Sequence, residues 1–328
     1  MNITSEAVLG FPYDNGMHYM FSRLNPHGPI SETGNLYYEA LYTLSPMEQQ
    51  IRAANIGALF DTILLAPADE YLPDRKSYEK DGVYYHSDLR VKMPVKLWPH
   101  GDDLDKLIDQ MEVDPVALNL IEQGSLPITQ AHLHAVVRRI VAQLILASSH
   151  RATIVFGDAG MVLANRILEI LQNRPSEQLN DLGRDASILH FPEAVMPVIG
   201  FDWRCDSVDS FAAVRQSKEI TQYSQDFRET IASVEDPLQL RATLLQRMRE
   251  AMDWEAVAAR AKATFETVGT TANIAGLFPV LGTLASLVNV HADMAQRAAT
   301  RTESNSQWYL LGPKMREVAL KDMLERGR

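Results

Sequence analysis

The stretch ATIVFGDAG, residues 152–160, decides which kind of fold this chain adopts. An apolar run typical of a buried strand leads directly into Gly157, Asp158 and Gly160, and a helical pattern follows over residues 161–171. Before it, residues 133–144 place apolar side chains at i, i+3, i+4, i+7, i+8 and i+11, which predicts an amphipathic helix. Helix, strand and helix in immediate succession are typical of α/β proteins with a mainly parallel sheet.

Three further apolar runs extend this pattern through the first part of the chain. We predict strands near residues 6–13, 62–67, 152–157 and 186–191, the first of them closed by a DNG turn. Between the first two, Ser45, Pro46 and Glu48 form a helix-start signature of cap, first-turn proline and capping-box acid. The predicted fold class is therefore α/β, with a sheet covered by helices on both faces.

From residue 206 onward only helical patterns are found. Residues 211–234 read as one amphipathic helix, and no strand-like run follows. We predict an α/β domain over residues 1–205 and an all-α domain over residues 206–328. Residues 74–98 contain a KDG turn and are expected to form a hairpin inserted on a loop of the first domain.

The charge of the chain is unevenly distributed. Residues 1–205 hold 16 Lys and Arg against 26 Asp and Glu, a balance of −10, whereas residues 206–328 hold 15 against 16, a balance of −1. An acidic first domain argues against broad binding to a nucleic-acid backbone. The single cysteine, Cys205, excludes an internal disulfide framework and suits a reducing cytosol, so we expect a cytoplasmic, bacterial-type protein.

Acidic residues follow each predicted strand and form the candidate site. In an open parallel sheet, ligands bind at the carboxyl ends of the strands. Carboxylates gathered there favour Mg²⁺ or Mn²⁺, which can polarise a phosphoryl oxygen and generate hydroxide. The candidate metal ligands are Asp14, Asp69, Glu70, Asp158 and Glu193, the last lying near His190.

The same acids have a simpler structural interpretation. Aspartate is a preferred N-cap, which stabilises a helix by about 1 kcal/mol, and a helix begins within three residues of Asp158. Other chemistries lack their motifs: GDAG has no phosphate-loop lysine, and no G-x-S-x-G elbow is present. His132 and His134 are two residues apart on a helix and cannot share one metal ion.

An uncharged apolar stretch, residues 267–292, is long enough to cross a bilayer. Pro279 lies in its middle, several Thr and Asn residues dilute it, and no aromatic belt flanks it. We therefore predict a buried apolar helical hairpin and keep membrane insertion as an alternative that is not favoured.

Three functions follow from these patterns. With no complete catalytic motif, the leading expectation is a partner-binding or regulatory subunit of a bacterial cytosolic assembly that contacts other protein subunits. The arrangement resembles that of bacterial proteins carried as antiviral-defence or mobile-element cargo, a resemblance that assigns no functional residue. The alternatives are a metal-dependent phosphoesterase or nuclease that uses the strand-end acids, and a membrane-active effector that exposes residues 267–292.

Overall fold

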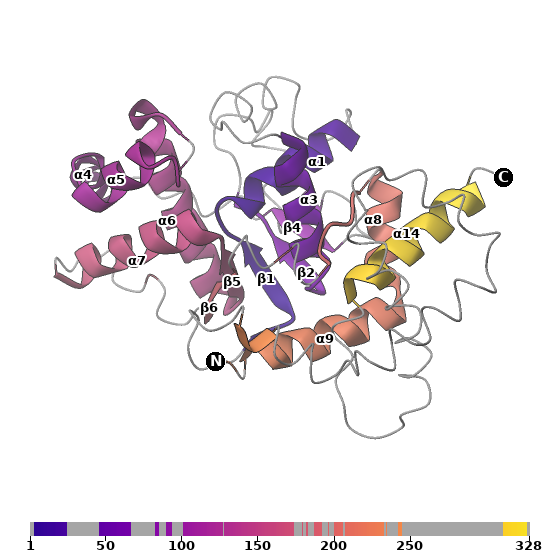
Figure 1. Cartoon of the computed structure of the whole chain (residues 1–328). Coiled ribbons are helices and arrows are strands. Elements are labelled where there is room, and N and C mark those ends of the chain that lie inside the picture. Colours follow the sequence, from indigo (N-terminus) through magenta and orange to yellow (C-terminus); the bar gives the residue numbers. More distant parts are fainter. Residues whose placement is uncertain are drawn as a thin grey trace.

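The computed structural model shows a mixed α/β fold in which helices flank a central sheet (Figure 1). It describes residues 3–24, 46–66, 83–84, 90–93, 101–126, 128–173, 179, 182, 187–191, 196, 200–205, 207–232, 234, 242–244 and 311–326.

The sheet has the strand order β3-β4-β2-β1-β5-β6. Strands β4, β2, β1, β5 and β6 are parallel to their neighbours, and only β3 runs antiparallel, against β4. Val8 of β1 is in register with Leu64 of β2 on one side and with Ile154 of β5 on the other. The strands are β1 (Glu6–Leu9), β2 (Thr62–Leu64), β3 (Val83–Tyr84), β4 (Val91–Met93), β5 (Thr153–Phe156) and β6 (Ser187–His190).

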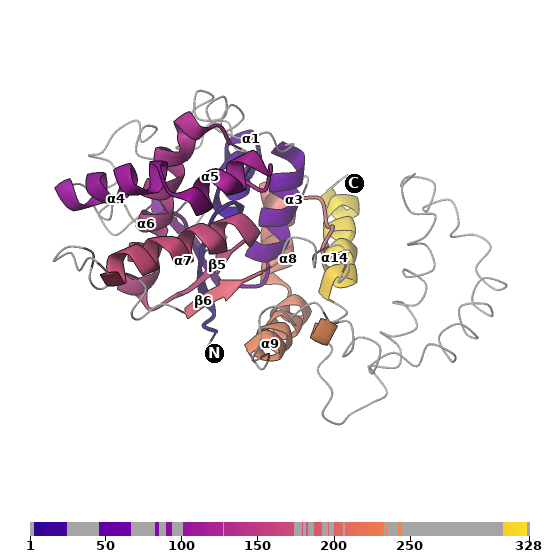
Figure 2. The ribbon, with the colours of Figure 1, turned by 60° about the vertical axis from the view of Figure 1, so that its left-hand side comes forward.

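Helices cover both faces of the sheet. The helices are α1 (Tyr13–Leu24), α3 (Pro46–Gly57), α4 (Asp102–Glu112), α5 (Pro115–Glu122), the 3-10 helix η5 (Gln130–His132), α6 (Leu133–His150), α7 (Asp158–Asn173), α8 (Val208–Gln216), α9 (Lys218–Ala232) and α14 (Leu311–Arg326). Helices α4 to α7 lie on one side of the sheet, and α1, α3, α8, α9 and α14 lie on the other (Figures 1 and 2).

The two sides have separate hydrophobic cores because neighbouring residues of a strand point to opposite faces. In β1, Ala7 and Leu9 join the core with α1, α3, α8, α9 and α14, whereas Val8 joins the core with α4 to α7. In β5, Val155 and Ile154 alternate in the same way. Strands buried on both faces account for the continuous apolar runs in the sequence.

Helices α8 and α9 also hold the chain between α3 and β2 through its carbonyl groups. Arg215 donates to the oxygens of Phe60 at 2.8 Å and of Asp61 at 2.5 Å. Arg228 donates to the carbonyl oxygen of Leu59, and Ser224 donates to that of Ala58 at 3.2 Å. Four consecutive carbonyls are thus satisfied by side chains more than 150 residues away along the chain.

Strands β1, β2, β5 and β6 lie within the four strand ranges expected from the sequence, but β1 is shorter than predicted. β1 ends at Leu9, and the DNG segment predicted as a turn lies in the first turn of α1. The N–H groups of Tyr13 and Asp14 both donate to the carbonyl oxygen of Gly10, which turns the chain into the helix within three residues.

The segment predicted as an inserted hairpin belongs to the sheet itself. β3 and β4 are antiparallel as a hairpin requires, but β4 also pairs in parallel with β2, through Ile63 and Val91. The hairpin pairing expected within residues 74–98 is therefore present in their described part, and the pairing of β4 with β2 is an addition that the sequence did not predict.

The single helix predicted over residues 211–234 is two helices, α8 and α9. Ser217 between them has extended backbone angles, with φ −65° and ψ 123°. Its carbonyl oxygen accepts from the N–H of Thr221 at 3.0 Å and its hydroxyl from that of Ile220 at 3.5 Å. Ser217 thus ends one helix and caps the next, a role that serine side chains favour.

The described C-terminal helices share a core with the sheet. Phe211 of α8, Phe227 of α9 and Met315 of α14 are buried in the same cluster as Leu9. The division between residues 205 and 206 stays a prediction. Residues 267–292 lie outside the described residues, and among the helices that are described none is long and apolar enough to cross a membrane.

Candidate functional site

The direction of strand winding reverses at β1. The connection from β1 through α1 and α3 leads to β2 on one side, and β5 pairs on the other side. At such a switch point the loops that leave the two strands diverge, and ligands of open α/β sheets bind there. Here two backbone hydrogen bonds join the ends of the two strands. Gly10 N donates to Val155 O at 2.9 Å, and Gly157 N donates to Phe11 O at 3.1 Å.

The glycines of the GDAG stretch and of the β1 loop permit this close approach. A Cβ atom on Gly160 would lie 2.2 Å from the carbonyl oxygen of Phe11, and one on Gly10 would lie 2.5 Å from the ring of Phe156. Both contacts are shorter than any real Cβ contact. Gly160 therefore serves to pack the first turn of α7 against the loop that follows β1.

Asp14 is fully buried and forms part of an ion pair. Its Oδ2 accepts from Arg139 Nε and, at 2.6 Å, from Gln143 Nε2, both on α6. The Oε1 atom of Gln143 accepts from Phe11 N at 3.2 Å, so the same side chain also holds the loop after β1. The guanidinium group of Arg139 supplies the positive charge that a metal ion would bring to Asp14.

His18 lies one helical turn after Asp14 and is also completely buried. Its Nε2–H donates to the carbonyl oxygen of Ala66, just beyond β2, at 3.1 Å. Burial, and secondly the positive charge of Arg139, lower the pKa of His18 from 6.5 to about 3. This ring is therefore neutral at physiological pH and serves as a hydrogen-bond donor.

Asp158 and His190 meet at the carboxyl ends of β5 and β6. His190 Nε2 lies 2.8 Å from Asp158 Oδ1, and the carboxylate is 55% exposed whereas the imidazole is 17% exposed. The N–H of Met161 donates to Gly157 O, which makes Gly157 the N-cap residue and Asp158 the first residue of α7. At this position the Asp158 carboxylate interacts favourably with the dipole of α7 and binds His190.

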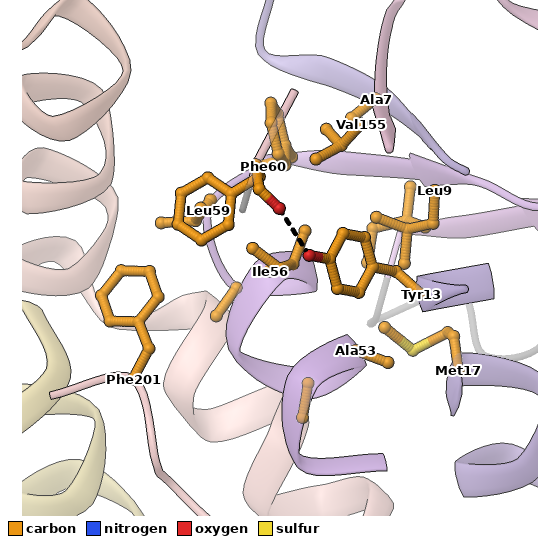
Figure 3. Close-up of a cluster of buried hydrophobic side chains, with 14 of the residues drawn as sticks. Ala7, Leu9, Tyr13, Met17, Ala53, Ile56, Leu59, Phe60, Val155 and Phe201 are labelled. Atoms are coloured by element: carbon orange, nitrogen blue, oxygen red, sulfur yellow. Dashed lines mark hydrogen bonds between the residues drawn. The ribbon is translucent and has the colours of Figure 1, made fainter. Parts of the chain in front are cut away.

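Tyr13 links the β1 loop to the end of β6. Its hydroxyl donates to the carbonyl oxygen of Phe191 at 2.7 Å within the hydrophobic cluster of Figure 3, where its ring lies beside Leu9 and Met17. The residue after His190 is thus held in place from α1, and this contact positions the Asp158–His190 pair relative to β1.

The predicted acids are only partly accounted for. Asp14 and Asp158 are placed as described above, whereas Asp69, Glu70 and Glu193 lie outside the described residues. In the part of the chain that the structure describes, no three His, Cys, Asp or Glu side chains are close enough together to hold a metal ion.

Three members of the site, Arg139, Gln143 and His18, were not predicted from the sequence. One signal was available: Arg139 and Gln143 are four residues apart on α6, on a helix whose other buried residues are almost all apolar. Two polar residues at that spacing on such a helix share one face and need a common buried partner.

Comparison of the chain with known proteins identifies no relative. No protein family, curated protein or solved structure matches the chain significantly.

Proposed function

We propose that this protein is a partner-binding or regulatory subunit, and that α14 is the element that contacts another protein subunit. The observation that carries the proposal is an apolar stripe on the second half of this helix. Leu320, Met323 and Leu324 are spaced i, i+3 and i+4 and are 40%, 52% and 58% exposed. This spacing is the one by which amphipathic helices insert into apolar grooves of a partner.

Contacts at both ends of α14 support the same role because they anchor the helix. Leu311 and Met315 are fully buried in the core shared with the sheet. Arg316 pairs with Asp202, and Arg326 pairs with Asp209 of α8. A helix held in this way loses little conformational freedom when it binds, which favours affinity.

We propose that the chain has an α/β part followed by a helical part with an apolar hairpin. The helical part provides the element that recognises the partner. A bacterial cytosolic setting, and a role in antiviral defence or as mobile-element cargo, belong to the proposal on sequence pattern alone. The burial of Asp14 against Arg139 further favours a binding role, because this acid is already neutralised by the protein.

Site-specific photo-cross-linking tests the proposal. A photoreactive amino acid at position 323, in cells that produce the protein, is expected to yield one predominant adduct, whereas the same group at the exposed position 321 is not. The partner identified from the adduct is then purified, and its affinity is measured by calorimetry. Leu324→Glu should weaken binding at least tenfold, and Lys321→Gln should leave it unchanged. Equal adducts at both positions, or equal affinities of both variants, would refute the proposal.

A metal-dependent phosphoesterase or nuclease is the second proposal, favoured by one observation. The Asp158 carboxylate is more than half exposed at the switch-point end of β5. If it binds Mg²⁺ or Mn²⁺, either ion should raise the melting temperature of the wild type as its concentration increases. Asp158→Asn should remove both that response and phosphodiester hydrolysis. If the wild type shows neither stabilisation by metal nor hydrolysis, the proposal of a metal-dependent enzyme is refuted.

A further inference from the structure

Exposed apolar side chains gather at two places on the molecule. In the part of the chain that the structure describes, six large apolar side chains are exposed, and they form two groups of three. One group is the stripe on α14 described above. The other is a valine cluster, made of Val113, Val116 and Val162, which are 72%, 42% and 38% exposed. Single exposed apolar residues are common, but a group of them on one surface indicates a contact site.

An ion pair brings the three valines to one surface. Val113 and Val116 flank Asp114 at the junction of α4 and α5, and the Asp114 carboxylate accepts from Arg166 Nε of α7 at 2.8 Å. Val162 lies one turn before Arg166 on α7 and therefore shares the face of this helix that is turned towards Asp114. The valine cluster thus surrounds a contact between α7 and the α4–α5 junction.

The surroundings of the two apolar groups differ in charge. Residues 102–122, which form α4 and α5, hold seven acidic residues and one lysine, a balance of −6. Ion pairs with α6 and α7 neutralise Asp105 and Asp114, which leaves the balance negative. Residues 311–326 of α14 hold four basic and three acidic residues, a balance of +1. A contact between two valine clusters would bring two acidic surfaces together, whereas α14 does not repel the cluster in this way.

The two groups cannot meet within one molecule. Helix α14 packs on one face of the sheet, and α4, α5 and α7 pack on the other (Figures 1 and 2). A second copy of the chain has no such restriction, because its α14 stripe can approach the valine cluster from outside. One contact of this kind covers both exposed apolar groups.

We propose that the valine cluster receives the α14 stripe of a second copy of this chain. The inference rests on the proposed partner-binding role of α14 and names its partner. Each pair of copies keeps one free stripe and one free valine cluster, so the contact is heterologous and builds a ring or an open chain of copies. Each side contributes three large apolar side chains, so the interface is small, and the association is weak and depends on concentration.

Sedimentation of purified variants tests the proposal. The average mass of the wild type should rise with concentration. Val113→Glu disables the cluster and Leu324→Glu disables the stripe, so each variant alone should stay monomeric. An equimolar mixture of the two should form dimers and nothing larger, because one intact stripe and one intact cluster remain. Ser149→Glu adds the same charge at an exposed position on the last turn of α6, outside both groups, and should associate as the wild type does.

Cross-linking gives a readout that does not depend on the folding of these variants. A photoreactive amino acid at position 323 of the purified protein should link to residues 113–116 or to residue 162 of another copy. Links to any other part of a second copy, or a mixture of Val113→Glu and Leu324→Glu that stays monomeric while the wild type associates, would overturn the proposal.

The results also separate this inference from the proposed function on which it rests. If the wild type stays monomeric at every concentration at which it is soluble, and position 323 still yields one predominant adduct in cells, α14 binds a different protein and only the present inference fails. If the wild type stays monomeric and position 323 yields no predominant adduct, both fail.

Discussion

The buried His18 makes the stability of this protein depend on pH in a way that the structure quantifies. Its folded-state pKa of about 3 lies below the ordinary value of 6.5, because the site is desolvated and faces Arg139. Between these two values the unfolded chain binds a proton at His18 and the folded chain does not. Stability from this group is therefore complete above pH 6.5 and is lost as the pH falls towards 3.

The size of the effect follows from proton linkage. Between pH 8 and pH 5, the unfolded state gains about 2 kcal/mol from protonation at position 18, and the folded state gains almost nothing. Carboxylates elsewhere also contribute a pH dependence, so the measurement is a difference between two proteins. His18→Gln keeps an N–H donor for Ala66 O and does not titrate, and it should lose about 2 kcal/mol less than the wild type over this range.

Urea unfolding at pH 8, 7, 6 and 5 in buffers of constant ionic strength provides the assay. His150→Gln, the same substitution at an exposed position, gives a matched control. The absolute stability of His18→Gln at pH 8 does not enter the test, because only the change with pH is compared. Equal slopes for wild type and His18→Gln would show that His18 is accessible to protons in the folded state and would refute the reasoning.

Three further predictions concern packing and capping, each measured by urea unfolding at pH 7.5. Gly160→Ala should destabilise the fold by about 2 kcal/mol or more, because its Cβ would lie 2.2 Å from Phe11 O. Gly124→Ala, in open space at φ +70°, should cost about 1 kcal/mol. Equal costs for the two variants would contradict the role of Gly160 in packing α7 against the loop after β1. Arg228→Met should cost about 2 kcal/mol by leaving the Leu59 carbonyl unpaired. Arg326→Met, at a surface ion pair, should lower stability much less, and the reverse order would contradict the role of Arg228 in binding that carbonyl. Asp114→Ala should cost about 1 kcal/mol through its cap on Val116 N and Ala117 N, and Asp114→Asn should retain most of that stability; similar losses in both would assign the effect to the Arg166 ion pair instead.

Much of the local structure could be predicted because it depends on short-range patterns. The apolar spacing of residues 133–144 indicated α6, and the run before Gly157 indicated β5. Asp114 before Pro115 is a local helix-start signal of the same kind, and the Asp114 side chain accepts from two N–H groups there. In each case, the residues that decide the conformation are close together along the chain.

The candidate site depends on contacts that no short pattern contains. Asp14 meets Arg139 across 125 positions, and Asp158 meets His190 across 32. The sequence identified both acids but assigned them to one metal-binding edge, whereas tertiary packing gives them different surroundings: one is buried against a guanidinium group, and the other is exposed beside an imidazole ring.

The sequence by itself determined the alternation of helices and strands, the apolar character of both sheet faces and the residues that follow each strand, because hydrophobic periodicity and turn chemistry act locally. Only the tertiary structure decided that β4 joins the sheet beside β2, that α8 and α9 bind the carbonyls of residues 58–61, and that Asp14 is paired and buried. The physical reason is that strand pairing, carbonyl capture and desolvation depend on which distant groups the folded chain brings within about 3 Å of each other.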